Sequence, residues 1–221
     1  MTSTSIDFLL WVRGPGFAAA VVIFLVGMVW RLIEIFSLGR KPDLSLPRER
    51  GGASGMHTVF RRFLFPPGML RRGPVAYLGG YIFHVGFGIV LLFFIPHIEM
   101  ARGVVGFGWP GLPTPFVDLV AVITMVTLVV MLVSRLTDPV KRFISTFEDY
   151  LVWALTVLPL LTGYLAYHHL LLPYRTMLAL HILAAELLLV AMPFTKLIHF
   201  VTLFPARWFN GDLFGHKGVA S

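Results

Sequence analysis

The chain consists of long apolar runs separated by shorter polar or charged stretches. A helix needs about 20 apolar residues to cross a hydrocarbon core about 30 Å thick, and five runs are long enough. We therefore expect an all-α integral membrane protein whose five transmembrane helices form a bundle at residues 17–38, 76–98, 115–134, 149–172 and 176–204. Between and beside them lie a segment at 1–16, a loop at 39–74 and a tail at 205–221.

Composition agrees with this pattern and narrows the chemistry. Of the 221 residues, 57% are hydrophobic, which is far above the average soluble domain and leaves no room for a soluble catalytic domain. Cysteine is absent, which excludes disulfides, iron–sulfur clusters, thioether-attached haem and a thiolate nucleophile in this chain. A redox centre here would depend on other ligands, and the chain has eight histidines.

The positive charges are distributed unevenly between the two sides of the membrane. Fourteen lysines and arginines lie in the 39–74 loop, the 135–147 connection and the residues from Lys196 onward, whereas only Arg13, Arg102 and Arg175 lie opposite. The positive-inside rule then places the N-terminus outside and the C-terminus in the cytoplasm, as in a multi-pass protein of the inner membrane. This bias explains the basic isoelectric point, so no nucleic-acid partner is expected.

Two histidines lie on the 176–204 segment. His181 and His199 are 18 residues apart, about five helical turns, so in one helix they share a stripe and lie roughly 27 Å apart. Imidazole inside a bilayer needs a partner, and haem iron explains two of them on one stripe. The alternative is that each histidine forms a hydrogen bond with a neighbouring helix.

The 76–98 segment carries a second pair. Gly80, His84 and Gly88 are spaced by four, so residues without side chains flank His84 on its own face. This pattern either clears a flat space for a haem or lets another helix approach closely. His97 follows Pro96 near the outer end, as a ligand or as an interfacial histidine.

The two segments run in opposite directions in this topology. His84 then comes level with His199, and His97 comes level with His181. We expect two six-coordinate haems b, one per leaflet, each held by one histidine from each segment. Because two nitrogen ligands leave no open position, these haems would carry electrons and not bind oxygen.

Several stretches resemble a known family. The pattern FHVG at 83–86, the two histidines 18 apart, and HFVTLFPARW at 199–208 resemble the respiratory nitrate reductase gamma subunit. The resemblance extends over about residues 15–210 and includes the membrane anchors of heterodisulfide-reductase-like and sulfite-reductase-associated complexes. It implies a dihaem cytochrome b that oxidises quinol near the outer face and passes electrons to a cytoplasmic iron–sulfur subunit.

The resemblance also assigns ligands. His84, His181 and His199 match the family's positions, but the fourth falls on Phe94 in this chain. Either His97 substitutes for it, which we favour, or the outer haem is missing or is held by His168 or His169.

The outer side also offers candidates for quinol and proton chemistry. Glu186 lies well inside an apolar run, where an ionised carboxylate is costly without a partner. It either relays a quinol proton or is a protonated side chain bonded to another helix. An outer cluster of Tyr164, Tyr167, His168, His169 and Arg102 is a candidate quinol pocket or an aromatic interfacial belt.

Two other classes of protein remain open. A haem-free membrane anchor would use the histidines only for packing. A small proton-conducting transporter subunit would carry more polar residues along its helices, or an internal repeat, and neither is visible.

Overall fold

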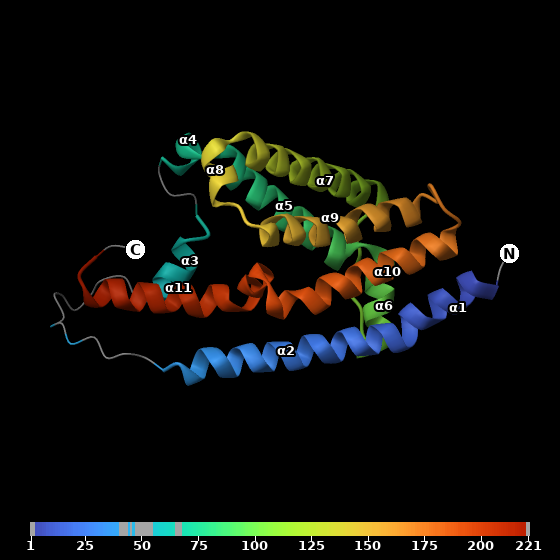
Figure 1. Cartoon of the computed structure of the whole chain (residues 1–221), viewed down its shortest axis with the longest axis horizontal. Helices are drawn as coiled ribbons and strands as arrows, with labels where there is room; N and C mark the ends of the chain where they lie inside the picture. Colours follow the sequence, from blue (N-terminus) through green and yellow to red (C-terminus); the bar gives the residue numbers. More distant parts are fainter. Residues whose placement is uncertain (1–2, 40–43, 45, 47–54, 65–67, 220–221) are drawn as a thin grey trace. The chain divides into compact units, whose positions relative to one another are not determined.

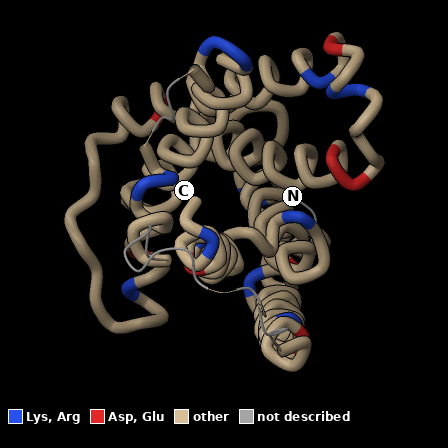
Figure 2. The backbone as a smooth tube through the Cα atoms, turned by 90° about the vertical axis from the view of Figure 1, so that its left-hand side faces the viewer, with Lys and Arg blue, Asp and Glu red and all other residues tan. Residues whose placement is uncertain are grey.

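The computed structural model describes residues 3–39, 44, 46, 55–64 and 68–219, and this part of the chain contains helices and no strand (Figure 1). Five of its helices are long and apolar enough to cross a membrane: Thr4–Ser37, Pro74–Phe93, Thr114–Thr137, Phe147–Tyr167 and Tyr174–Phe194. The all-α, five-span prediction is therefore confirmed, and the chain is a multi-pass membrane protein. Figure 2 shows long stretches of helix that carry no charged residue.

The chain divides into two compact units, residues 1–22 with 73–190 and residues 23–72 with 191–221. The first contains α1 (Ser3–Trp11), η1 (Val12–Gly16), the start of α2 (Phe17–Ser37), α5 (Pro74–Phe93), α6 (Ile95–Val105), α7 (Thr114–Thr137), α8 (Pro139–Ile144), α9 (Phe147–Tyr167) and α10 (Tyr174–Ala191). The second contains the rest of α2, α3 (Gly55–Arg61), α4 (Met69–Arg72), the 3₁₀ turns η2 (Met192–Phe194) and η3 (Lys196–Ile198), and α11 (His199–His216).

The first helix is longer than expected. Residues 1–16 were predicted to be a separate outer segment, but the helix begins at Ser3 and continues through a π-helical turn, Val12–Gly16, into α2. Pro15 lies inside that turn, and proline has no N–H to continue an α-helical ladder. The wider π turn keeps the helix continuous across the proline.

Helix α7 packs between α5 and α9 in the first unit. Gly86 of α5 lies against the side chain of Thr124, which is fully buried, so any larger residue at 86 would overlap it. On the other side, the indole N–H of Trp153 donates to the Leu128 carbonyl at 2.8 Å. These contacts hold α5 and α9 against α7.

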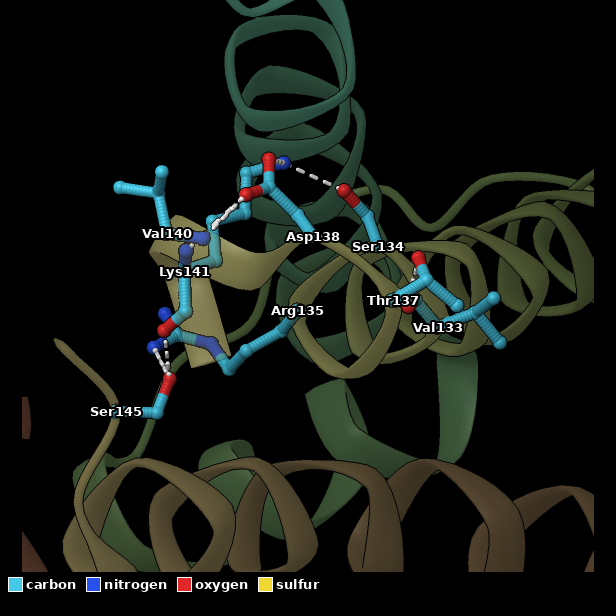
Figure 3. Close-up of polar contacts among 8 residues, drawn as sticks. All are labelled: Val133, Ser134, Arg135, Thr137, Asp138, Val140, Lys141 and Ser145. Atoms are coloured by element: carbon cyan, nitrogen blue, oxygen red, sulfur yellow. Dashed lines mark hydrogen bonds and ion pairs between the residues drawn. The ribbon is translucent and has the colours of Figure 1, made fainter. Parts of the chain in front are cut away.

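Polar side chains hold the turn from α7 into α8 (Figure 3). The Asp138 carboxylate accepts the backbone N–H groups of Val140 and Lys141, which begins α8. The Lys141 ammonium donates to the Ser134 hydroxyl at 2.6 Å, and Arg135 donates to Ser145 at 2.9 Å. The connection predicted from its charges is therefore a short capped helix.

The predicted helix at 176–204 is two helices. Helix α10 ends at Ala191, two 3₁₀ turns follow, and α11 begins at His199. Thr195 between the turns has extended backbone angles, and its hydroxyl accepts the Leu197 N–H while donating to the Ala191 carbonyl. Because the helix is interrupted, the single stripe through His181 and His199 was a wrong inference.

In the second unit, α2 packs against the residues that follow this break. Phe24 stacks on Phe200 with ring centroids 6.2 Å apart. A side chain at Gly27 would collide with Pro193 and Phe194, so glycine there permits the close approach of α2.

The predicted basic loop at 39–74 is partly helical, with α3 and α4 at its described end. Arg40, Lys41, Arg48 and Arg50 fall outside the described residues. The 205–221 tail continues α11 as far as His216.

Candidate functional site

The helix predicted at 76–98 breaks before the candidate ligand His97. Helix α5 ends at Phe93, and Phe94 leaves the helical conformation with ψ 123°. Pro96 has no N–H to give to the carbonyl of Leu92, four residues earlier. The Trp109 indole N–H donates to that carbonyl at 2.6 Å instead. The loop that carries Trp109 thereby stabilises the break, after which α6 begins.

The break places His97 in the first turn of α6. Its Nδ1 bonds the Val90 carbonyl at 3.0 Å, back at the end of α5. His181 of α10 bonds the Pro159 carbonyl of α9 through its own Nδ1, also at 3.0 Å. Gly163 lies directly against the His181 ring, where a Cβ would come within 2.9 Å of the ring carbon Cε1.

These two histidines lie together. The ring centroids of His97 and His181 are 6.0 Å apart, and the ring planes are 15° from parallel. A metal bound at about 2.0 Å by one nitrogen of each ring requires centroids roughly 6 Å apart. The observed centroid spacing is close to that value.

Hydrogen bonding also fixes which nitrogen of each ring carries the proton. A carbonyl only accepts, so Nδ1 of His97 and of His181 must each carry the proton of a neutral ring. Nε2 then has the lone pair that a metal needs. Among the described residues, neither Nε2 atom has a hydrogen-bond partner.

His84 of α5 has the same arrangement. Its Nδ1 donates to the Gly80 carbonyl at 2.6 Å, and its side chain is exposed. The glycines around it divide into two faces. Cβ atoms added at Gly80 or Gly88 would meet no described atom within 4 Å, whereas one at Gly79 would collide with Met131 of α7. Helix contact thus uses Gly79, and the face of Gly80 and Gly88 is open.

His199 is the first residue of α11 and belongs to the second unit. Its Nδ1 donates to the Lys196 carbonyl at 2.7 Å. All four candidate histidines therefore bond a main-chain carbonyl through Nδ1. The pairing of His84 with His199 stays a prediction.

Part of the expected outer cluster comes together around His168. The His168 ring lies 4.3 Å from the Tyr164 ring and 5.3 Å from the Tyr167 ring. Its buried Nε2 lies 3.4 Å from the Asp118 carboxylate at the start of α7, without hydrogen-bond geometry. This places an acid–base pair between α7 and the end of α9.

The other members of the expected cluster make different contacts. His169 has a positive φ of 57°, is exposed, and stacks on Tyr174 with centroids 4.9 Å apart. Arg102 pairs with Glu99 at 3.0 Å on the surface of α6. The adjacent histidines 168 and 169 therefore do not share one pocket.

A line of aromatic rings connects the two parts of the site. Phe94 lies edge to face with His97 at 5.3 Å and with Tyr167 at 5.2 Å. Tyr167 in turn contacts His168. Two rings, Phe94 and Tyr167, therefore lie between the histidine pair and the acid–base pair.

Glu186 lies on α10 beside the π-helical turn of the first helix. The side chain is buried, with 6% of the residue exposed, and Oε1 has no hydrogen-bond partner among the described residues. Oε2 faces Gly16, where an added Cβ would lie 3.3 Å away. No described lysine, arginine or histidine forms an ion pair with it, so the group fits a protonated carboxyl.

The sequence analysis did not identify Asp118 as a member of the site or Phe94 as a ring contact. It also did not identify Pro159 and Gly163 as the residues that hold the His181 ring. A signal was available, since glycine four residues after proline leaves one open face beside a main-chain carbonyl. Asp118, an acid inside an apolar run, was a second signal.

The fold defines a multi-pass helical membrane protein in which the imidazoles of His97 and His181 lie close together. No family model matches the chain, and no solved structure matches it. It is 31% identical over 194 residues to a protein of Nitratidesulfovibrio vulgaris strain Hildenborough, covering 87% of this chain and 82% of the relative. The chain belongs to the same family as that protein, whose name, simply "Protein", gives no activity, ligand or partner.

Proposed function

We propose that this chain is the membrane cytochrome b subunit of a respiratory redox complex. It would carry electrons between the quinone pool and a cytoplasmic iron–sulfur subunit through two bis-histidine haems b. The observation that supports this most is the pair His97 and His181, with ring centroids 6.0 Å apart and each Nδ1 bonded to a main-chain carbonyl. Bound haem supplies one-electron transfer, and the protein supplies ligands, orientation and exclusion of water.

The donor set favours haem over a bare metal ion. The described residues contain no group of three or more histidine, cysteine, aspartate or glutamate side chains placed to hold a metal. Two imidazoles alone do not complete the four or more ligands that transition metals take in proteins. A porphyrin brings four nitrogens of its own, so two axial histidines suffice.

His84 and His199 are the proposed ligands of the second haem. Both rings bond a carbonyl through Nδ1, so Nε2 carries the lone pair of the neutral ring. The open face of Gly80 and Gly88 beside His84 supports a flat group on that side of α5. A haem there would cover the exposed imidazole.

The proposed quinol site lies at His168. Oxidising a quinol releases two electrons and two protons, so the site needs a base near an electron acceptor. His168, beside Asp118 and the Tyr164 ring, offers the base. The Phe94 and Tyr167 rings connect it with the histidine pair. Glu186 is the proposed group that passes a proton onward, and His169 remains a candidate at the edge of the site.

The charge pattern supports the orientation and the partner. With the basic loop and tail in the cytoplasm, an iron–sulfur subunit would dock on that face of an inner-membrane complex. Any iron–sulfur cluster must belong to that subunit, since this chain has no cysteine.

Quinol-driven reduction of the haem in the purified protein tests the proposal. A reduced quinone analogue should reduce haem b in the wild type and reduce it more slowly in His168→Ala. His57→Ala is the matched control, because that histidine is exposed and belongs to the second unit. Equal rates in wild type and His168→Ala would move the quinol site, and a colourless wild-type protein would favour a haem-free anchor.

A further inference from the structure

Helix α3 has one face that is buried within its own unit. Gly55 lies against Trp208 of α11, where any Cβ would collide with the indole and the main chain. Thr58 fills the space beside Gly211 of α11 and is fully buried, and Val59 is 5% exposed. Figure 1 shows α3 lying against α11. The two glycines let the helices approach this closely.

A second face of α3 and the turn after it is apolar and largely exposed. Met56, Phe60, Phe63 and Leu64 follow a spacing of four, seven and eight residues from Met56, which is one helical stripe. They are 59%, 66%, 43% and 68% exposed. A stripe of this kind on a helix too short to span a bilayer is typical of an interfacial helix.

Arginines lie next to this stripe, and no acidic side chain in the same segment balances their positive charge. Residues 55–72 contain Arg61, Arg62, Arg71 and Arg72 and no aspartate or glutamate. No described acidic residue forms an ion pair with any of these four. Arg207 of α11, by contrast, lies 4.5 Å over the Phe63 ring and donates to the Val59 carbonyl, so it ties α11 to α3.

The location of residues 55–72 in the chain indicates which surface they contact. It connects α2 with α5, two helices that are long and apolar enough to span a membrane. Met69–Arg72 precedes the first residue of α5 almost directly. A short segment that connects two membrane-spanning helices is expected at the level of the lipid headgroups, where those helices leave the bilayer.

We propose that α3 is an interfacial anchor that binds anionic lipid. Its stripe of Met56, Phe60, Phe63 and Leu64 inserts at the boundary of the acyl chains, while Arg61 and Arg62 contact headgroup phosphates. Apolar burial and charge attraction both favour this position, and each arginine near an anionic surface adds to the attraction. The anchor fixes α3, and with it α11, at the membrane surface.

Single-cysteine labelling tests the insertion, and the native chain has no cysteine to remove. A spin label at Phe60→Cys or Leu64→Cys, in full-length protein in nanodiscs of phosphatidylcholine with phosphatidylglycerol, should collide readily with oxygen and severalfold less with a water-soluble nickel reagent. A label at Glu99→Cys, an exposed acid on the surface of α6, should show the reverse. Nickel access at Phe60 equal to that at Glu99 would overturn the proposal. Shielding from both reagents would also overturn it, because a protein would then cover the stripe.

Lipid retention tests the charge. Native mass spectrometry of the detergent-solubilised protein should show phosphatidylglycerol retained over phosphatidylcholine. The double variant Arg61→Gln, Arg62→Gln should lose that preference. Arg175→Gln, an exposed arginine at the start of α10, is the matched control and should keep it. Unchanged retention in the double variant would contradict the proposal, and both readouts are independent of haem.

Discussion

The imidazoles of His97 and His181 lie with centroids 6.0 Å apart and planes 15° from parallel. They come from α6 and α10, and each ring bonds the main-chain carbonyl of another helix, α5 for His97 and α9 for His181. Four helices of one unit therefore determine the position of this pair. Rings fixed in this way keep one orientation, as the proposed pair of axial ligands requires.

Replacing one ring of the pair should remove one haem and keep the other. For His97→Ala and for His181→Ala, we expect the haem b content to fall from about two to about one per chain, because one axial ligand is lost. His169→Ala should keep the wild-type content. The measurement is a pyridine haemochrome assay on each purified variant. Full haem content in both alanine variants would contradict the assignment.

Gly163 should be needed to leave space for the imidazole of His181. A Cβ at this position would lie 2.9 Å from the ring, so Gly163→Ala must displace the imidazole. We expect a loss of about 1–3 kcal/mol in stability, as in other overpacked sites, together with a shift in the potential of one haem. Gly103→Ala in α6, where a Cβ meets nothing within 4 Å, is the control. Thermal denaturation and redox titration measure the two effects.

The glycines of α5 should separate into two classes. Gly80→Leu and Gly88→Leu place a side chain in open space, so the protein should fold normally but bind less haem at His84. Gly79→Leu should instead destabilise the packing of α5 on α7 by about 1–3 kcal/mol. Melting temperature and haem content distinguish them. If Gly80→Leu and Gly88→Leu bound haem as fully as the wild type, these glycines would have no role in haem clearance.

Glu186 should affect proton transfer without affecting haem binding. Glu186→Gln keeps the shape of the side chain and removes its titration, so haem content should stay unchanged. We expect the quinol oxidation rate to fall at least about tenfold, because a proton-transfer group is lost, and its pH dependence to change. Glu99→Gln, an exposed acid paired with Arg102, is the control. If Glu186→Gln matched the wild type in rate and pH profile, the relay role would be withdrawn.

Asp138 should make the turn into α8 sensitive to acid. The Lys141 backbone N–H, followed by the Val140 N–H and the Lys141 charge, lowers the pKa of Asp138 below its usual value. Its stabilising effect is therefore present above the unfolded pKa of about 3.9 and is lost as the pH falls through the lower folded value. Asp138→Asn keeps a cap but does not titrate, so its melting temperature should fall less steeply below about pH 4. Parallel melting curves would contradict this.

The five spans were predictable because hydropathy over about 20 residues reports membrane spans directly. The positions where helices end were not. Apolar residues continue through Phe94 and through Phe194, so the runs at 76–98 and 176–204 read as single helices. The breaks depend on Pro96, Pro193 and Thr195. They also depend on which groups donate hydrogen bonds to the main-chain carbonyls that lose their helical partner at these positions.

The sequence indicated which residue types belong to the candidate site, but only part of how those residues are arranged in space. Counting along ideal helices paired His97 with His181, and the rings do lie together. The single stripe with His199 fails because Thr195 interrupts the helix. Asp118 was missed because the face of α7 that meets His168 depends on the packing between α7 and α9, which no local pattern encodes.

Counting haem in the purified wild-type chain decides between a cytochrome and a haem-free anchor. A pyridine haemochrome assay combined with a redox titration gives the haem b content per chain and the number of midpoint potentials. We predict about two haems per chain with two potentials, one from the His97 and His181 pair and one from His84 and His199. A single haem would leave one of the two pairs without its cofactor. Protein without haem from haem-replete cells would contradict the cytochrome assignment.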